Sequence, residues 1–336
     1  MNIKEAIRKA IEKEDINQED SYKVALSIMN GEATDAQIGS LITALRMKGE
    51  TVDEITGFVK AMRDKVTRIK APDEYLIDTC GTGGDGAGTF NISTISALVA
   101  AGAGCSVAKH GNRSVSSQCG SADLLKELGV NIENTPEKVE KCIEKVGVGF
   151  LFAPLLHPAM KYAIGPRREM GVRTIFNILG PLTNPAGAKR QLLGVYSKEL
   201  TTPIANVLAN LDSIHCMVVH GEDGLDEITT TGKTYISELK DGEIKEYTLS
   251  PEDFGMIKRT PEDLKGGTPE INAKIALNLL EGGTGGKREI TILNSGAAIY
   301  VAGKAESLAG GIEKAKESID SGEALKKLEK LKEIAK

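Results

Sequence analysis

The sequence contains no tryptophan, few aromatic residues and no apolar run near the roughly 20 residues that a membrane-spanning helix needs. Its start, MNIKEAIRKAIEKED, mixes charged and apolar positions and lacks the apolar centre of a signal peptide. A basic excess is also missing, since the net charge of the 336 residues is −5. General nucleic-acid binders usually carry a basic surface. We therefore expect no membrane and no nucleic-acid partner, although a local cationic pocket for phosphates stays possible.

Cysteine is present at five positions, an odd number, and no pair has CxxC spacing. A zinc site or a disulfide framework is therefore not expected, and a reducing cytoplasm is the better prediction. Cys80 and Cys119 lie in glycine-rich segments. We interpret both as small packing residues, because the sequence supplies no base that would activate a thiol.

Two patterns divide the chain. The first 70 residues predict helices, with capping boxes that begin at Thr34 and Thr51 and precede amphipathic runs. After them, short apolar strands alternate with helices, which predicts a mostly parallel sheet flanked by helices, and a hairpin turn is expected at Asp241-Gly242. The fold class is therefore α/β. We predict a small all-helical domain of residues 1–70 plus roughly 158–185, and a large α/β domain of residues 71–157 and 186–336.

The segment DTCGTGGD begins at Asp78, inside the first predicted strand, YLIDTC, and continues into a glycine-rich loop. Glycines permit positive φ angles and let backbone N–H groups approach an anion closely. The next helix should begin near Ser93 and present its positive end, with Asn91 and Thr94 adding short polar side chains. This pattern predicts a diphosphate cradle. A glycine-rich turn before a capped helix would look similar, and the GxxxxGK[ST] pattern of a P-loop is absent.

The segment KHGNRSVSS follows the second predicted strand, and GSAD comes shortly after it. Lys109 and Arg113 supply positive charge, and Asn112 and the serines supply neutral donors, a set that can bind phosphate or ribose oxygens. For Lys109 the alternative is a solvated loop charge, which the preceding apolar strand disfavours. For His110 we favour a structural hydrogen-bonding histidine over a general base.

An arginine-rich segment contains His157, Arg167, Arg168 and Arg173. A guanidinium can bind a planar carboxylate through two parallel hydrogen bonds. Three arginines within seven residues also often form a solvated helix face, so composition alone does not choose among them.

Asp226 and Glu227 are adjacent carboxylates after an apolar strand. Mg²⁺ is usually held by one or two carboxylates together with substrate phosphates and waters. Such a pair is common in surface loops, so by itself it indicates only a loop.

In combination, the motifs are more specific. GTGGD, NIST, KHGNRxxSS with GSAD, RTIFNILGPLTNPA and HGxxGLDE occur in this order, and essentially the whole chain resembles the anthranilate phosphoribosyltransferase family. The resemblance implies the fold shared with pyrimidine nucleoside phosphorylases and a homodimer. It also implies Mg²⁺-dependent transfer from phosphoribosyl diphosphate to the amine of anthranilate in tryptophan biosynthesis. Association with anthranilate synthase is a further possibility.

The resemblance also implies roles for individual residues. Phosphoribosyl diphosphate would contact Gly81, Gly84, Asp85, Thr89, Asn91, Ser93, Thr94, Lys109, His110, Gly111, Asn112, Arg113, Ser114, Val115, Ser116, Ser117 and Ser121. Anthranilate would contact Gly81, Asn112, His157 and Arg167, with Arg167 as the carboxylate partner. Ser93, Asp226 and Glu227 would bind Mg²⁺. No general base is assigned, and Lys109 and Mg²⁺ would stabilise the leaving group.

Two alternatives remain. A pyrimidine nucleoside phosphorylase would share the fold, but its glycine-rich signature has a KHSTGGVGD-like order, whereas Lys109 and His110 lie in a later segment, before Gly-Asn-Arg. A non-catalytic relative that binds nucleic acid would have altered motifs and a basic surface. The intact motifs and the net charge of −5 argue against it.

Overall fold

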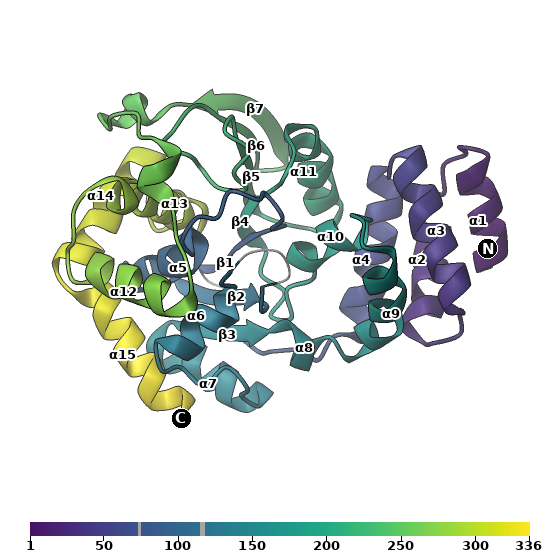
Figure 1. Ribbon diagram of the computed structural model, residues 1–336, viewed down its shortest axis with the longest axis horizontal. Helices are drawn as coiled ribbons and strands as arrows, with labels where there is room; N and C mark the ends of the chain where they lie inside the picture. The colour runs from purple at the N-terminus through teal and green to yellow at the C-terminus, as the bar shows by residue number, and fades with distance from the viewer. Residues whose placement is uncertain (73–74, 115–117) are drawn as a thin grey trace.

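The computed structural model describes residues 1–72, 75–114 and 118–336. It places a helical bundle at the amino-terminal end of the molecule and a larger α/β part beside it (Figure 1). Capping boxes begin two of the bundle helices at Thr34 and Thr51, as the sequence predicts, because each threonine accepts a backbone hydrogen bond three residues on. The bundle consists of α1 (Ile3–Ile11), α2 (Gln18–Met29), α3 (Asp35–Lys48) and α4 (Val52–Lys65).

The centre of the α/β part is a seven-stranded sheet with the order β3-β2-β1-β4-β5-β6-β7. Strands β1 to β5 are parallel to one another, and β6 and β7 are added antiparallel. The predicted mostly parallel sheet and the hairpin are therefore confirmed, and Asp241 and Gly242 turn the hairpin with φ angles of 53° and 79°. The strands are β1 (Leu76–Gly81), β2 (Ser106–Gly111), β3 (Val148–Phe152), β4 (Arg190–Gly194), β5 (His215–Gly221), β6 (Thr234–Lys240) and β7 (Glu243–Leu249).

Helices cover both faces of the sheet, because alternate strand residues point to opposite sides. Leu192 and Met217 join one apolar core, whereas Leu193 and Val218 join a second core that continues into the bundle. The α/β part has these helices besides those of the segment between β3 and β4: α5 (Ile92–Gly102), α6 (Ser121–Glu127), α7 (Pro136–Val146), α11 (Thr201–Asn210), α12 (Pro269–Leu280), α13 (Gly286–Val301), α14 (Leu308–Asp320) and α15 (Glu323–Ala335). Its 3₁₀ turns in the same regions are η3 (Lys198–Leu200), η4 (Pro251–Phe254) and η5 (Pro261–Leu264). Among them, α5 packs against β1, α13 and α15, and α11 packs against β5, β6 and α4.

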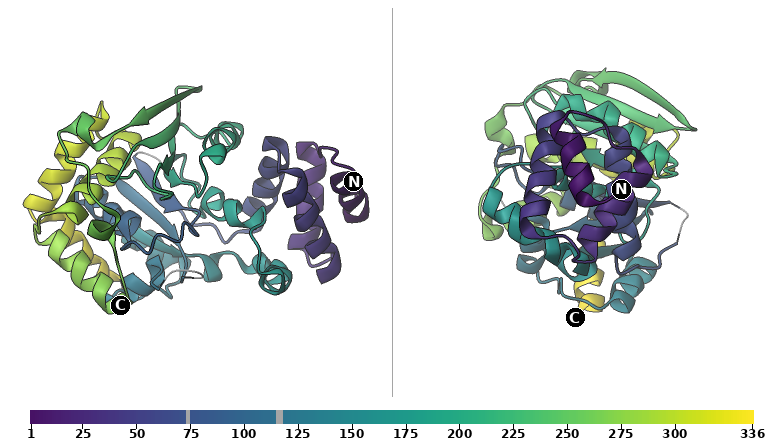
Figure 2. Two further views of the ribbon diagram at one scale, coloured as in Figure 1. Left: turned by 45° about the horizontal axis from the view of Figure 1, so that its top comes forward. Right: turned by 90° about the vertical axis from the view of Figure 1, so that its right-hand side faces the viewer.

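A helical insertion between β3 and β4 lies between the bundle and the sheet (Figures 1 and 2). Phe176 of this insertion contacts Phe58 of α4 edge to face, with ring centroids 6.3 Å apart. Ala163 and Leu179 are buried in the same core as the bundle. The insertion consists of α8 (Ala153–Leu156), η1 (Pro158–Met160), α9 (Lys161–Met170), α10 (Phe176–Leu179) and η2 (Gly180–Thr183). Within the described ranges, no helix is long and apolar enough to span a membrane.

Candidate active site

The predicted site segments meet at the carboxyl edge of the parallel strands. The glycine-rich loop follows β1, Lys109 and His110 end β2, and the Asp226-Glu227 pair follows β5. Since β1 is hydrogen-bonded to both β2 and β4, and β4 to β5, these strand ends are neighbours. The helical insertion reaches the same edge. This is where parallel α/β sheets usually bind ligands.

Two glycines allow Asp226 to enter this edge. Gly81 and Gly194 are register partners at the ends of β1 and β4. A Cβ atom at Gly81 would overlap the carboxylate of Asp226, and one at Gly194 would overlap its backbone. Both positions therefore need glycine for close approach of the β5 loop.

Asp226 and Glu227 accept hydrogen bonds from the backbone of residues 78–94, which the sequence predicts as the diphosphate cradle and which we call the diphosphate segment. Asp226 accepts a hydrogen bond from the Gly83 N–H at 2.7 Å, and Glu227 accepts one from the Ser93 N–H at 3.1 Å. Asn91, which precedes α5, makes no side-chain capping hydrogen bond, so the carboxylate of Glu227 satisfies an amide at this helix start from a distant loop. The pair is thus packed against the loop after β1 rather than lying in an independent surface loop.

The two carboxylates are crowded. Both residues are half-buried. Burial, and next the negative charge of Asp85, raises the pKa of Asp226 to about 7. Burial and the charge of Asp226 hold the pKa of Glu227 well above its usual range. A bound cation would stabilise the ionised forms of these two carboxylates.

The donor chemistry fits Mg²⁺ bound together with a phosphorylated substrate. Across residues 1–72, 75–114 and 118–336, no group of three or more His, Cys, Asp or Glu side chains could hold a metal ion by itself. Mg²⁺ typically needs only one or two carboxylates when phosphates and waters complete its octahedron. The hydroxyl of Ser93 and the carboxylates of Asp226 and Glu227 are hard oxygen donors of this kind.

Lys109 lies beneath the diphosphate segment. It belongs to β2 itself and is 3% exposed, so it is not a solvated loop charge. Its Nζ donates to the Thr79 carbonyl at 2.5 Å and contacts Ser93 Oγ at 3.4 Å. The Lys109 amine therefore lies beside Ser93 at the start of α5.

Asp78 and Asn184 support the site but were not assigned from the sequence. Asp78 is fully buried and accepts hydrogen bonds from the His110 N–H at 3.1 Å and the Asn184 amide at 2.8 Å. Asn184 also donates to the Ala108 carbonyl at 2.8 Å. A carboxylate inside the apolar strand YLIDTC was the available signal. These contacts hold β1 and β2 to the segment that directly follows η2.

Ser121 and Asp123 hold the described part of the KHGNRSVSS segment, residues 109–114. Ser121 Oγ bonds to both the N–H and the carbonyl of Asn112, each at 3.2 Å, and Asp123 accepts from the Ser114 N–H at 3.1 Å. Arg113 is exposed and lies 3.4 Å from Glu133. A Cβ at Gly111 would overlap Ser121 Oγ. Val115, Ser116 and Ser117 lie outside the described residues.

The other residues predicted to contact phosphoribosyl diphosphate lie near the start of α5. Asn91 donates to the Cys119 carbonyl at 3.0 Å and accepts from Asn272 at 2.9 Å. Thr94 is buried, and Thr89 forms an isolated bridge with Lys265. Asn91 therefore connects the diphosphate segment to α12.

Two histidines meet between the sheet and the insertion. The Nε2 atoms of His110 and His157 lie 3.1 Å apart, and both residues are buried. Burial lowers the pKa of His110 to about 3 and that of His157 to about 4, so both imidazoles are neutral at pH 7. A hydrogen bond with the Gly180 backbone opposes the decrease at His110. We infer that His110 donates to the carbonyl through Nδ1, so that its Nε2 accepts from His157.

The structure distinguishes the three arginines of the insertion. Arg167 is half-buried, its guanidinium lies 5.2 Å from the centroid of the Phe176 ring, and burial lowers its pKa. Within the described parts of the chain, it has no carboxylate within ion-pair distance. Arg168 and Arg173 are both exposed, but Arg173 donates to the Gly84 carbonyl. A half-buried cation without an acidic partner favours an anionic ligand at Arg167.

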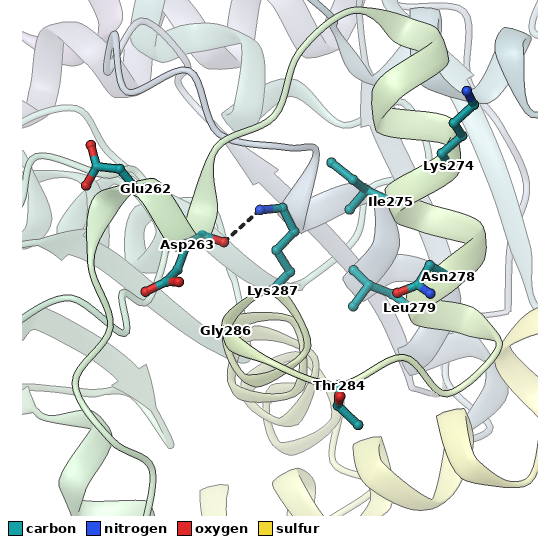
Figure 3. Close-up of a pocket in the computed structure, with 9 residues that line it drawn as sticks. All are labelled: Glu262, Asp263, Lys274, Ile275, Asn278, Leu279, Thr284, Gly286 and Lys287. Carbon is teal, nitrogen blue, oxygen red and sulfur yellow. Dashed lines mark hydrogen bonds between the residues drawn. The ribbon is translucent and has the colours of Figure 1, made fainter.

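A separate cavity of about 510 Å³ lies between α12 and α13 (Figure 3). Lys287 points along its wall and donates to the Asp263 carbonyl at 2.7 Å. None of the predicted site residues lines this cavity. It is lined by Glu262, Asp263, Lys274, Ile275, Asn278, Leu279, Thr284, Gly286 and Lys287.

Comparison with known proteins agrees with this arrangement. Residues 4–66 match the helical bundle domain of a glycosyl transferase family, and residues 73–325 match the a/b domain of the same family. The chain therefore belongs to this glycosyl transferase family. A protein of Alkaliphilus metalliredigens named anthranilate phosphoribosyltransferase is 57% identical over 329 residues, which cover 98% of this chain and 97% of that protein. Within the glycosyl transferase family, the chain thus belongs to the anthranilate phosphoribosyltransferases.

Solved structures give the same result. Anthranilate phosphoribosyltransferase from Thermus thermophilus is 45% identical, with a TM-score of 0.93 over 98% of this chain and 99% of that one. The Saccharomyces cerevisiae enzyme, solved in complex with PRPP and Mg, is 28% identical, with a TM-score of 0.90 over 99% of this chain and 97% of that one. The expected fold class, a helical domain plus a larger α/β domain, is confirmed.

Proposed function

We propose that this enzyme transfers the phosphoribosyl group of 5-phosphoribosyl 1-diphosphate to the amine of anthranilate. The products are N-(5-phosphoribosyl)anthranilate and diphosphate, and the reaction belongs to tryptophan biosynthesis. One observation carries the proposal. A glycine-rich loop and two crowded carboxylates share a sheet edge, and the insertion that contacts this edge through His157 and Arg173 also carries half-buried Arg167, which has no acidic partner among the described residues.

The donor side of the proposal rests on the loop after β1 and the start of α5. Backbone N–H groups at a glycine-rich turn and the positive end of an 11-residue helix favour the diphosphate. Buried Lys109 adds a full positive charge beside Ser93. The loop of Asn112 to Ser117 and Ser121 would contribute further donors to phosphate and ribose oxygens. These groups act on charge that increases on the leaving diphosphate.

Ser93, Asp226 and Glu227 are the residues that would hold Mg²⁺ in this proposal. When bound, Mg²⁺ neutralises negative charge on the diphosphate as it leaves. The chain's own contribution is to direct these oxygens at the diphosphate segment, since Asp226 and Glu227 are anchored to its backbone.

On the acceptor side, Arg167 would bind the anthranilate carboxylate, with Asn112, Gly81 and His157 as further contacts. The aryl amine is neutral before it attacks C1 of the ribose, so no strong base is required at that stage. Alignment of the amine with C1 is the main contribution of these residues, and positioning is worth about 7–11 kcal/mol at best. The C–O bond to diphosphate breaks as the C–N bond forms, and a proton then leaves the nitrogen.

The proposal extends to assembly, location and domain division. A homodimer is supported by the exposure of Ile11 and Met47 on the bundle, 67% and 80% respectively. Association with anthranilate synthase rests on the family resemblance alone. A cytoplasmic location is supported by the free thiols of Cys80, Cys105, Cys142 and Cys216. The insertion's shared core with the bundle supports a helical domain of residues 1–70 plus roughly 158–185.

A single assay tests the function. Anthranilate fluorescence should decrease when the enzyme receives phosphoribosyl diphosphate and Mg²⁺, and no decrease should occur if either is omitted. Phosphate-dependent nucleoside cleavage without anthranilate consumption would instead identify a nucleoside phosphorylase. Salt-sensitive DNA binding without transferase activity would support the non-catalytic alternative.

A further inference from the structure

Arg173 connects the helical insertion to the diphosphate loop, and none of the roles above uses it. Its guanidinium donates through Nη2 to the carbonyl of Gly84, 89 positions earlier in the chain. A Cβ placed on Gly84 would lie 3.4 Å from the same Nη2 atom, so the guanidinium is packed directly against this loop. The other contact of the guanidinium is the ring of Tyr196, whose centroid is 4.5 Å from Cζ.

Tyr196 is itself attached to the same loop. Its N–H donates to Thr82 Oγ1 at 3.1 Å, and the Thr82 N–H donates to the Gly194 carbonyl at 2.9 Å. Arg173 therefore lies between the end of β4 and the middle of the loop after β1. Among the described residues, no carboxylate forms an ion pair with Arg173, so a backbone carbonyl and an aromatic ring are its observed partners.

Binding of the Gly84 carbonyl has a consequence for the neighbouring amides. Gly83 and Gly84 have φ angles of +67° and +77°, so this turn is built from conformations that glycine adopts readily. In a trans peptide the carbonyl of Gly84 and the N–H of Asp85 point in opposite directions. Holding that carbonyl on Arg173 therefore directs the Asp85 N–H to the other side of the loop. Asp226 holds the preceding Gly83 N–H at 2.7 Å.

We propose that Arg173 is a positioning residue that fixes the peptide planes of the diphosphate loop, residues 82–88, for donor binding. It lies six positions after Arg167 on the same insertion, so the same segment carries the proposed acceptor contact and restrains the donor loop. The part of this proposal that concerns donor binding rests on the proposed function, whereas the restraint of the loop by Arg173 is independent of it.

The test compares Arg173→Ala with Arg168→Ala, a matched control that removes an exposed arginine from the same insertion. We expect Arg173→Ala to raise the KM for phosphoribosyl diphosphate at least about tenfold, equivalent to about 1.4 kcal/mol. The KM for anthranilate and kcat should change less than about threefold. Arg173→Lys should recover only part of the loss, because lysine retains the charge but not the planar group that stacks on Tyr196. Arg168→Ala should behave as the unsubstituted enzyme.

Hydrogen exchange of the ligand-free protein separates the two parts of the proposal. Backbone amides of residues 82–88 should exchange faster in Arg173→Ala than in Arg168→Ala, whereas amides of the bundle should be unchanged. Tyr196→Leu, which removes the stacking surface but keeps Arg173, should produce the same local effect if Arg173→Ala does not fold. Equal exchange rates in the loop, or equal increases in both KM values, would overturn the positioning role. Faster exchange with no anthranilate consumption by the unsubstituted enzyme would instead reject the proposed function.

Discussion

Mild acid should destabilise this protein through the buried pair of His110 and His157. Their Nε2 atoms are 3.1 Å apart, and burial lowers the two pKa values to about 3 and about 4. An unfolded histidine titrates near pH 6.5. Because the folded-state pKa values lie below this value, the unfolded chain binds protons first as the pH decreases. The stabilisation is complete above about pH 6.5 and is lost toward about pH 4 for His157 and about pH 3 for His110.

The size of the effect follows from the same pKa values. At pH 5 both native imidazoles are still largely neutral, whereas an unfolded imidazole is mostly protonated. Between pH 8 and pH 5, each histidine should therefore lower the free energy of unfolding by about 2 kcal/mol, since one pKa unit corresponds to about 1.4 kcal/mol. Together they account for about 4 kcal/mol, a large fraction of a typical stability of about 5–15 kcal/mol.

Urea unfolding followed by far-ultraviolet circular dichroism measures this loss, with His157→Gln as the comparison. The glutamine amide can still donate to Nε2 of His110 but does not titrate. Its packing cost appears at both pH values and cancels when each protein is compared with itself. The loss between pH 8 and pH 5 should be about 2 kcal/mol smaller in His157→Gln. Equal losses in both proteins would show that His157 is not held neutral in the folded state.

Three substitutions test the proposed site. Arg167→Ala should raise the anthranilate KM about 10- to 100-fold, because a charged hydrogen bond is worth about 1.5–3 kcal/mol, with little change in the phosphoribosyl diphosphate KM. Equal changes in both values would reject this role. Asp226→Asn combined with Glu227→Gln should raise the Mg²⁺ concentration for half-maximal turnover at least about tenfold, and an unaltered Mg²⁺ titration would contradict the metal assignment. Lys109→Ala should lower kcat/KM for phosphoribosyl diphosphate at least about tenfold, because it removes the buried charge beside Ser93. If thermal unfolding showed lower stability but kinetics were normal, Lys109 would be only structural.

Structural elements that depend on contacts between residues close in the sequence were predictable. Capping boxes at Thr34 and Thr51 and the Asp241-Gly242 turn depend on contacts within four residues, and all three are observed. Strand order is different. β4 lies beside β1 although more than 100 residues separate them in the sequence, and β2, β3, three helices and the helical insertion all come between. No local periodicity contains this information.

The site divides in the same way. Motif order identified the loops, but it did not show that Asp226 bonds to Gly83, 143 positions away. The family resemblance predicted a ligand for Arg167 but gave no role to Arg173 in the same insertion. Their difference is purely one of environment, since Arg167 stacks on Phe176 and Arg173 binds the Gly84 carbonyl. Asp78 was missed because its partners, His110 and Asn184, come from two other segments.

The folded chain holds groups of opposite charge at two separate places in the candidate site. On one side, burial and then neighbouring negative charge raise the pKa values of Asp226 and Glu227, so their ionised forms are disfavoured there. On the other side, Arg167 is half-buried and has no acidic partner among the described residues. A cation relieves the first strain and a carboxylate relieves the second. In the proposed function, Mg²⁺ and the anthranilate carboxylate would supply these opposite charges, so part of the free energy of substrate binding would come from groups that the folded chain holds apart.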